Sequence, residues 1–144
     1  MDSLRVNADL QKDLFGVLLI EVQVNGKDFP DQDSWGVDLE TFFDAINSQK
    51  KTMRFVRGCG DFDCCGVEVS ARSSTNCWEW EFERRTLQIP WSDVERAVAE
   101  VITSVEQLSD DGFGFGPQYL EERLKYFRHK LGEVQAFFSG ENKS

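Results

Sequence analysis

The chain has 144 residues, with 16 Lys and Arg against 26 Asp and Glu, which gives a formal net charge of −10. Hydrophobic residues make up 40% and charged residues 29%, a globular composition that excludes a disordered acidic tail. The length suits one domain, so we expect a single domain over residues 1–144. The longest apolar run, Val17 to Ile20, is too short to cross a bilayer, and the N-terminus lacks a signal-peptide pattern. We therefore expect a cytoplasmic protein.

The charge and the single histidine narrow the classes of function. A net charge of −10 should repel nucleic-acid phosphates and anionic lipid, and it should attract basic proteins. His129 is the one histidine, and it falls late in a helical pattern, so a nucleophilic triad has only one possible base. We expect a binding protein without enzymatic activity, with neither nucleic acid nor membrane as its partner.

The first third of the chain predicts a strand and a short helix. Leu4–Leu14 has mixed character, for which we expect a short helix. Phe15–Val24 alternates as a strand and ends at an Asn25-Gly26 turn. After a polar segment, Asp38 is typical of an N-cap, and apolar residues at helical spacing follow it to about Ser48.

The middle of the chain predicts further strands. Thr52–Arg57 alternates as a strand and leads into a corner rich in glycine and cysteine at residues 58–66. Two alternating stretches, 67–72 and 78–83, then flank a turn at Ser74-Thr75 and predict a hairpin. A last strand, Thr86–Ile89, precedes Pro90.

The expected hairpin register places Ala71 opposite Trp78, which makes one face apolar and aromatic. On the other face the same register sets Glu68 opposite Glu81, and like charges across strands reduce stability. Two interpretations follow: arginines from a neighbouring strand neutralise the glutamates, or the glutamates form a docking surface for a cationic partner.

Two amphipathic helices are predicted at the end of the chain. Residues 94–108 and 120–138 each have apolar residues three and four positions apart, and Pro117 suits the first turn of the second helix. The order of elements predicts an α+β fold, with a mostly antiparallel sheet of about four to five strands. Helices, two of them C-terminal, should pack on one face of this sheet.

A second acidic tract covers residues 28–49, which contain six carboxylates and no Lys or Arg. Asp31 and Asp33 flank Trp35 closely, in a segment with the composition of a turn. One interpretation is a loop that presents Trp35 as an anchor among carboxylates. The other is an ordinary exposed loop with Trp35 folded onto the core.

Four cysteines lie within nineteen residues of sequence, at Cys59, Cys64, Cys65 and Cys77. Their spacing lacks the paired Cys-x-x-Cys knuckles of a zinc site, and a stable disulfide is not expected in a reducing cytoplasm. We expect no metal, with small thiols filling a tight corner. Cys77 should face outward as an exposed thiol in the expected register.

One segment has a recognisable order of residues. Cys59-Gly60-Asp61-Phe62-Asp63-Cys64 is followed by Val67-Glu68-Val69 and then by Trp78 and Trp80. This order resembles small uncharacterised bacterial proteins in which a Cys-Gly-Asp-x-x-Cys turn precedes a Val-x-Val strand and a tryptophan-bearing strand. Cys65 stands where that pattern has glycine. The resemblance covers residues 54–82 and implies a corner of the fold rather than an activity.

In size, acidity and expected fold class, the chain is also similar to immunity proteins of bacterial toxin systems, with which it shares no motif. This similarity implies a protein that neutralises a cationic toxin, plausibly a nuclease, by direct binding and without a cofactor. We also expect a monomer or weak dimer. The partner-binding residues expected from the two acidic tracts are Glu68, Glu79, Glu81, Glu83, Asp31, Asp33 and Trp35. Two alternatives stay open: a structural zinc or thiol protein built on Cys59–Cys77, and an adaptor that self-associates through an exposed aromatic patch.

Overall fold

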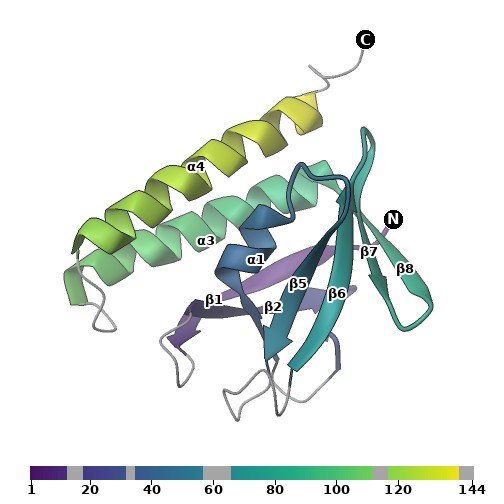
Figure 1. Cartoon of the computed structure of the whole chain (residues 1–144), viewed down its shortest axis with the longest axis horizontal. Coiled ribbons are helices and arrows are strands. Elements are labelled where there is room, and N and C mark those ends of the chain that lie inside the picture. The colour runs from purple at the N-terminus through teal and green to yellow at the C-terminus, as the bar shows by residue number, and fades with distance from the viewer. Residues whose placement is uncertain (13–17, 32–34, 57–65, 112–116, 140–144) are drawn as a thin grey trace.

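One curled antiparallel sheet and two long helices make up most of the protein (Figure 1). The computed structural model describes residues 1–12, 18–31, 35–56, 66–111 and 117–139. Within these ranges the fold is α+β, as the order of elements predicts, with two of its helices at the C-terminal end.

Eight strands form the sheet in the described residues, so the expected number of four to five is wrong. Their bounds are β1 Leu4–Lys12, β2 Leu18–Val24, β3 Lys27–Asp28, β4 Gly36–Asp38, β5 Lys51–Val56, β6 Gly66–Ser73, β7 Cys77–Phe82 and β8 Arg85–Pro90. The strand order is β1-β2-β4-β5-β6-β7-β8, and β3 pairs with β2. Strands of two and three residues, such as β3 and β4, are too short to show alternation in the sequence.

Strand β1 replaces the short helix expected near the N-terminus. It pairs with β2 through Leu4 opposite Val24 and Leu10 opposite Ile20, with a register shift between Val6 and Leu10. Extra residues in one strand break the simple alternation of apolar and polar side chains. The sequence of β1 therefore has a mixed pattern although the segment is a strand throughout.

The two ends of the sheet meet at Asp2, just before β1. The Asp2 amide donates to the carbonyl of Gln88 on β8 at 2.8 Å, and the Gln88 amide donates to the Asp2 carboxylate at 2.8 Å. The Asn25 side chain also donates to the Asp2 carboxylate, and this bond is the main reason that the Asp2 pKa is lowered from its ordinary value. The sheet therefore curls until its first and last strands are linked through one residue.

Three helices lie in the described residues: α1 Leu39–Asp44, α3 Trp91–Asp111 and α4 Pro117–Ser139. Asp38 is the N-cap of α1, as predicted, and its side chain accepts a hydrogen bond from the Glu40 amide at 3.0 Å. The predicted apolar stripe of α3 is buried along its whole length, from Val94 to Leu108. Helix α3 packs on β1 and against α4, and Figure 1 shows the two long helices side by side along the sheet.

Aromatic side chains fill the core between the sheet and the helices. Trp78 and Trp80 are fully buried, and both rings contact Phe42 of α1 edge-on. Phe43 of α1 stacks on Phe127 of α4, with ring centroids 4.0 Å apart. These contacts hold α1 between the inner face of the sheet and α4.

The β6–β7 hairpin forms where predicted, but its register differs by two residues from the expected one. Ala71 lies opposite Trp80, and Ser73 lies opposite Trp78. The turn is therefore at residues 75 and 76, and the Ser74 amide donates to the Cys77 carbonyl at 3.0 Å. A shift of two keeps each side chain on its own face of the sheet but changes every cross-strand neighbour.

Candidate functional site

The corrected register changes the charges that meet on the outer face of the sheet. Glu68 lies opposite Arg54 of β5. Glu79 lies opposite Arg72 of β6 and, on its other side, opposite Gln88 of β8. The expected pairing of Glu68 with Glu81 is wrong because Glu81 lies opposite Ser70, whereas Glu68 and Glu79 each lie opposite an arginine of a neighbouring strand.

Glu79, Glu81 and Glu83 remain as a row of carboxylates along β7 and the turn after it, which we name the β7 glutamate row. Glu81 is exposed and has neutral neighbours on both sides, with Ser70 opposite it on β6 and Thr86 opposite it on β8. Glu83 is exposed in the β7–β8 turn. The far end of the row is therefore less neutralised by cross-strand partners than Glu79 is.

The nearby surface has mixed charge rather than a uniformly acidic one. Glu79 and Glu81 line a shallow hollow of about 50 Å³ together with Lys50 and Arg72. Two cations thus stand beside the two carboxylates on this face, which weakens the local negative potential. The hairpin face alone does not make a purely anionic patch.

The carboxylates of residues 38–44 act mainly within the fold. Glu40 accepts a hydrogen bond from Tyr119 of α4 at 3.3 Å and forms an ion pair with Arg123 of the same helix at 3.0 Å. Asp44 accepts a hydrogen bond from Tyr126 of the same helix. With the Asp38 cap, these contacts fix α1 at its start and tie it to α4.

Trp35 faces the core and does not present an exposed anchor. Its side chain is buried, and its indole N–H donates to the Asp31 carboxylate at 2.6 Å. The Asp31 residue itself is exposed. Asp33, the third expected contact of this tract, lies outside the described residues.

The expectation for Cys77 is wrong, because its side chain is buried. The thiol lies 3.7 Å from the Ser74 hydroxyl in the adjoining turn, so the turn covers it. Cys59, Cys64 and Cys65 lie outside the described residues, so the corner that they form stays a prediction. Within the described ranges, no group of three or more His, Cys, Asp or Glu is placed to hold a metal ion.

Large apolar side chains are scarce on the surface. Among the residues that the structure describes, only Met1 and Tyr119 are large hydrophobics with exposed side chains. Self-association through an exposed aromatic patch therefore stays a prediction. In the same part of the chain, no helix combines the length and apolar character needed to span a membrane.

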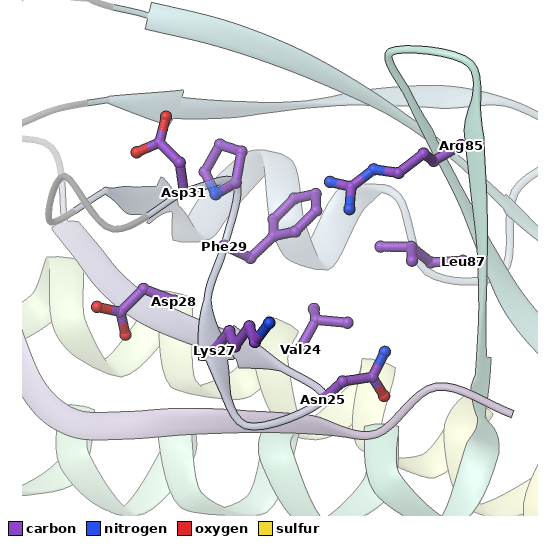
Figure 2. Close-up of a pocket in the computed structure, with 9 residues that line it drawn as sticks. Val24, Asn25, Lys27, Asp28, Phe29, Asp31, Arg85 and Leu87 are labelled. Carbon is purple, nitrogen blue, oxygen red and sulfur yellow. The ribbon is translucent and has the colours of Figure 1, made fainter.

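A pocket of about 460 Å³ opens between the β2–β3 hairpin and β8, and sequence analysis missed it (Figure 2). Val24, Phe29 and Leu87 form its apolar surface, and Lys27 and Arg85 supply positive charge. Its walls come from segments about sixty residues apart in sequence, so no local motif signals it.

Two tight turns fix the positions of the pocket cations. Asn25 and Gly26 both have positive φ angles, 56° and 80°, as the predicted Asn-Gly turn requires. Glu83 and Arg84 adopt the same left-handed conformation, with φ angles of 49° and 66°, although neither is a residue that favours it. Left-handed backbone costs about 1 kcal/mol or more at such residues. The backbone of the β7–β8 turn is therefore strained at the two residues that precede Arg85.

Comparisons with protein families, with curated proteins and with solved structures find no match to this chain. The surfaces of this chain therefore have to be interpreted from their own chemistry.

Proposed function

We propose that this chain is a non-enzymatic binding protein that neutralises a basic protein partner, as an immunity protein does with a cationic bacterial toxin. The formal net charge of −10 is the observation that carries the proposal. A nuclease fits the role of partner because a surface that binds nucleic-acid phosphates is itself basic. Carboxylates of this chain would occupy the positions that phosphates take on such a surface.

The surplus negative charge lies on more than one element. Helix α3 contains six acidic residues and one arginine, 1 − 6 = −5, although Asp93 and Glu106 of this helix are paired with arginines. Charge spread over the molecule attracts a basic partner at a distance, whatever surface finally makes contact. Steering therefore does not require a single acidic patch.

The proposed contact surface is the far end of the β7 glutamate row, which consists of Glu81 and Glu83. Glu81 and Glu83 are exposed, and the strands on either side place neutral residues opposite Glu81. Glu68 and Glu79 lie opposite arginines and contribute less. The carboxylates of α1 are engaged by α4 and are assigned to the fold, and Trp35 is assigned to the core.

The experiment first identifies whether a gene directly beside this one encodes a secreted protein with a basic C-terminal domain, and then uses that domain as the partner. Cells that express this domain should grow only when the present chain is co-expressed. The association rate, measured by stopped flow, should fall at least about tenfold between about 50 mM and about 500 mM salt, because salt screens charge steering. Failure to restore growth, or an association rate that does not change with salt, would contradict the proposal.

A further inference from the structure

The pocket between the β2–β3 hairpin and β8 has the size of a small-molecule site. Its volume of about 460 Å³ falls within the range of about 300–1,000 Å³ that is usual for such sites. The apolar surface comes from Val24, Phe29 and Leu87, of which Phe29 is 4% exposed and also packs on Phe55 and Phe82. The floor is therefore preformed by the aromatic core.

Two cations stand over this apolar floor. Figure 2 shows the guanidinium of Arg85 directed toward the ring of Phe29, with Lys27 on the neighbouring hairpin. Neither side chain forms a close ion pair with another described residue, although the charge of Arg85 contributes to the lowered pKa of the Asp2 carboxyl group. Each is the first residue after a tight turn, so the backbone that carries it is held in place on both sides of the pocket.

The acidic residues of the pocket lie at its other end and have hydrogen-bond donors of their own. Gln23 donates to the Asp28 carboxylate at 3.2 Å, and Trp35 donates to the Asp31 carboxylate at 2.6 Å. In Figure 2 both carboxylates are directed away from Phe29. Their charge still opposes part of the attraction that Lys27 and Arg85 exert on an anion.

We propose that this pocket binds a small organic carboxylate with an aromatic or apolar body. The carboxylate lies on the Arg85 fork, with Lys27 as a second cation, and the body lies against Val24, Phe29 and Leu87. A monoanion fits better than a phosphate ester because the second charge of a dianion makes it costlier to remove from water. This proposal does not rest on the proposed docking of a basic protein, although Arg85 directly follows the β7–β8 turn that contains Glu83.

The test is a titration of the ¹⁵N-labelled full chain with phenylacetate, followed by NMR. A ligand of this size should bind with a dissociation constant of about 1 mM. Saturable shifts should concentrate on the amides of Asn25 to Phe29 and of Arg85 to Leu87. Phenethylamine and phenyl phosphate, which share the ring but differ in charge, should each bind at least about fivefold more weakly.

The variants come in matched pairs. Arg85→Ala should weaken phenylacetate binding about tenfold or more, whereas Arg84→Ala, in the same turn but outside the pocket lining, should leave it within about twofold. In a second pair, Lys27→Ala should weaken binding, whereas Lys50→Ala, outside the pocket lining, should not. This pair tests the proposal even if a variant of the β7–β8 turn folds poorly. Arg85→Lys should retain part of the affinity because it keeps the charge but loses the fork.

Three results would overturn the proposal. One is the absence of saturable shifts in the pocket amides at about twenty times the expected dissociation constant. Another is equal or tighter binding of phenethylamine or phenyl phosphate. The third is an equal loss of affinity in the Arg84→Ala and Arg85→Ala proteins.

Discussion

Residues 38–44 and the β7 glutamate row both carry several carboxylates, but these carboxylates have different neighbours. In residues 38–44, Asp38 caps α1, while Glu40 and Asp44 accept hydrogen bonds from α4. In the β7 glutamate row, Glu81 and Glu83 are exposed, and no hydrogen bond or ion pair joins them to another described residue. The carboxylates of residues 38–44 are therefore engaged within the fold, whereas Glu81 and Glu83 belong to the docking surface that we propose.

The comparison shows that a carboxylate's role depends on what faces it. Residues 38–44 and 79–83 each contain three acidic residues and no Lys or Arg, and both suggest a docking surface when they are considered alone. Only the tertiary neighbours separate them: tyrosines and an arginine of α4 in one case, and neutral strand residues in the other. Removing contacts from each tract in turn tests this division.

The largest loss of stability should come from removing the apolar contact between α1 and α4. Phe43→Ala removes a fully buried ring that stacks on Phe127, so we expect the free energy of unfolding to fall by about 3–5 kcal/mol. Urea unfolding followed by tryptophan fluorescence measures the change. A loss below about 1 kcal/mol would show that α1 does not depend on this contact.

Variants of Asp38 should separate its contribution as a helix cap from the cost of burying its charge. Burial is the main reason that the Asp38 pKa is raised above its ordinary value of 3.8. The folded state therefore holds the proton more tightly than the unfolded state, and the contribution to stability is lost as pH rises through the folded pKa. Asp38→Ala should lose about 1 kcal/mol with the cap, whereas Asp38→Asn keeps the cap without the charge.

The measurement is urea unfolding of the Asp38 variants at neutral pH and below pH 3.8. Asp38→Asn should be at least as stable as the parent protein at neutral pH, and this advantage should shrink under acid conditions. If Asp38→Asn instead lost as much stability as Asp38→Ala at neutral pH, the ionised carboxylate would be required and the expected direction of the pH dependence would be wrong.

Tyr126 should report the polar contact between α1 and α4. Burial and then the Asp44 carboxylate raise the pKa of Tyr126 above 10.0, and burial followed by the Glu40 charge raises that of Tyr119. The chain has 2 Tyr, so ultraviolet absorbance at alkaline pH follows these two phenols alone. Both should titrate above pH 10 in the folded protein, and stability should fall as they ionise.

Two variants sharpen this titration. Asp44→Asn should lower the Tyr126 step toward the ordinary value, because it removes the negative acceptor, and leave the Tyr119 step in place. Tyr126→Phe should reduce the free energy of unfolding by about 1 kcal/mol or less, since the contact is partly solvated. An unchanged alkaline titration in Asp44→Asn would contradict the contact.

The smallest effect on stability should come from the β7 glutamate row. Glu81→Lys combined with Glu83→Lys should change the free energy of unfolding by no more than about 0.5 kcal/mol, because neither side chain is held by a described neighbour. Thermal or urea unfolding measures it. A loss above about 2 kcal/mol would move these glutamates into the same structural class as Glu40 and Asp44.

Much of the fold could be predicted from local patterns. The apolar spacing of α3, the Asp38 cap and the Asn25-Gly26 turn are all confirmed, because each depends on residues close in sequence. The tight turn at Glu83-Arg84 has neither glycine nor asparagine, so nothing in the sequence indicates its left-handed backbone.

The site could be predicted less well, because it depends on pairing. A strand has a side-chain period of two, so a register shift of two residues leaves burial unchanged and escapes any alternation argument. Alternation therefore predicts the correct face for Trp78 and Trp80 but the wrong partner for Glu68. The pocket forms because the curl of the sheet brings Lys27 and Arg85 into one lining although they are far apart in sequence. Local patterns do not reveal such a contact.

The most direct test of the central claim compares two charge-reversed proteins. Glu81→Lys with Glu83→Lys alters the β7 glutamate row, and Glu121→Lys with Glu122→Lys alters exposed residues of α4, so both change the net charge equally. We predict that affinity for the neighbouring basic domain falls about a hundredfold in the first protein, and about tenfold or less in the second. Equal losses in the two proteins would contradict the claim that the outer end of β7 is the docking surface.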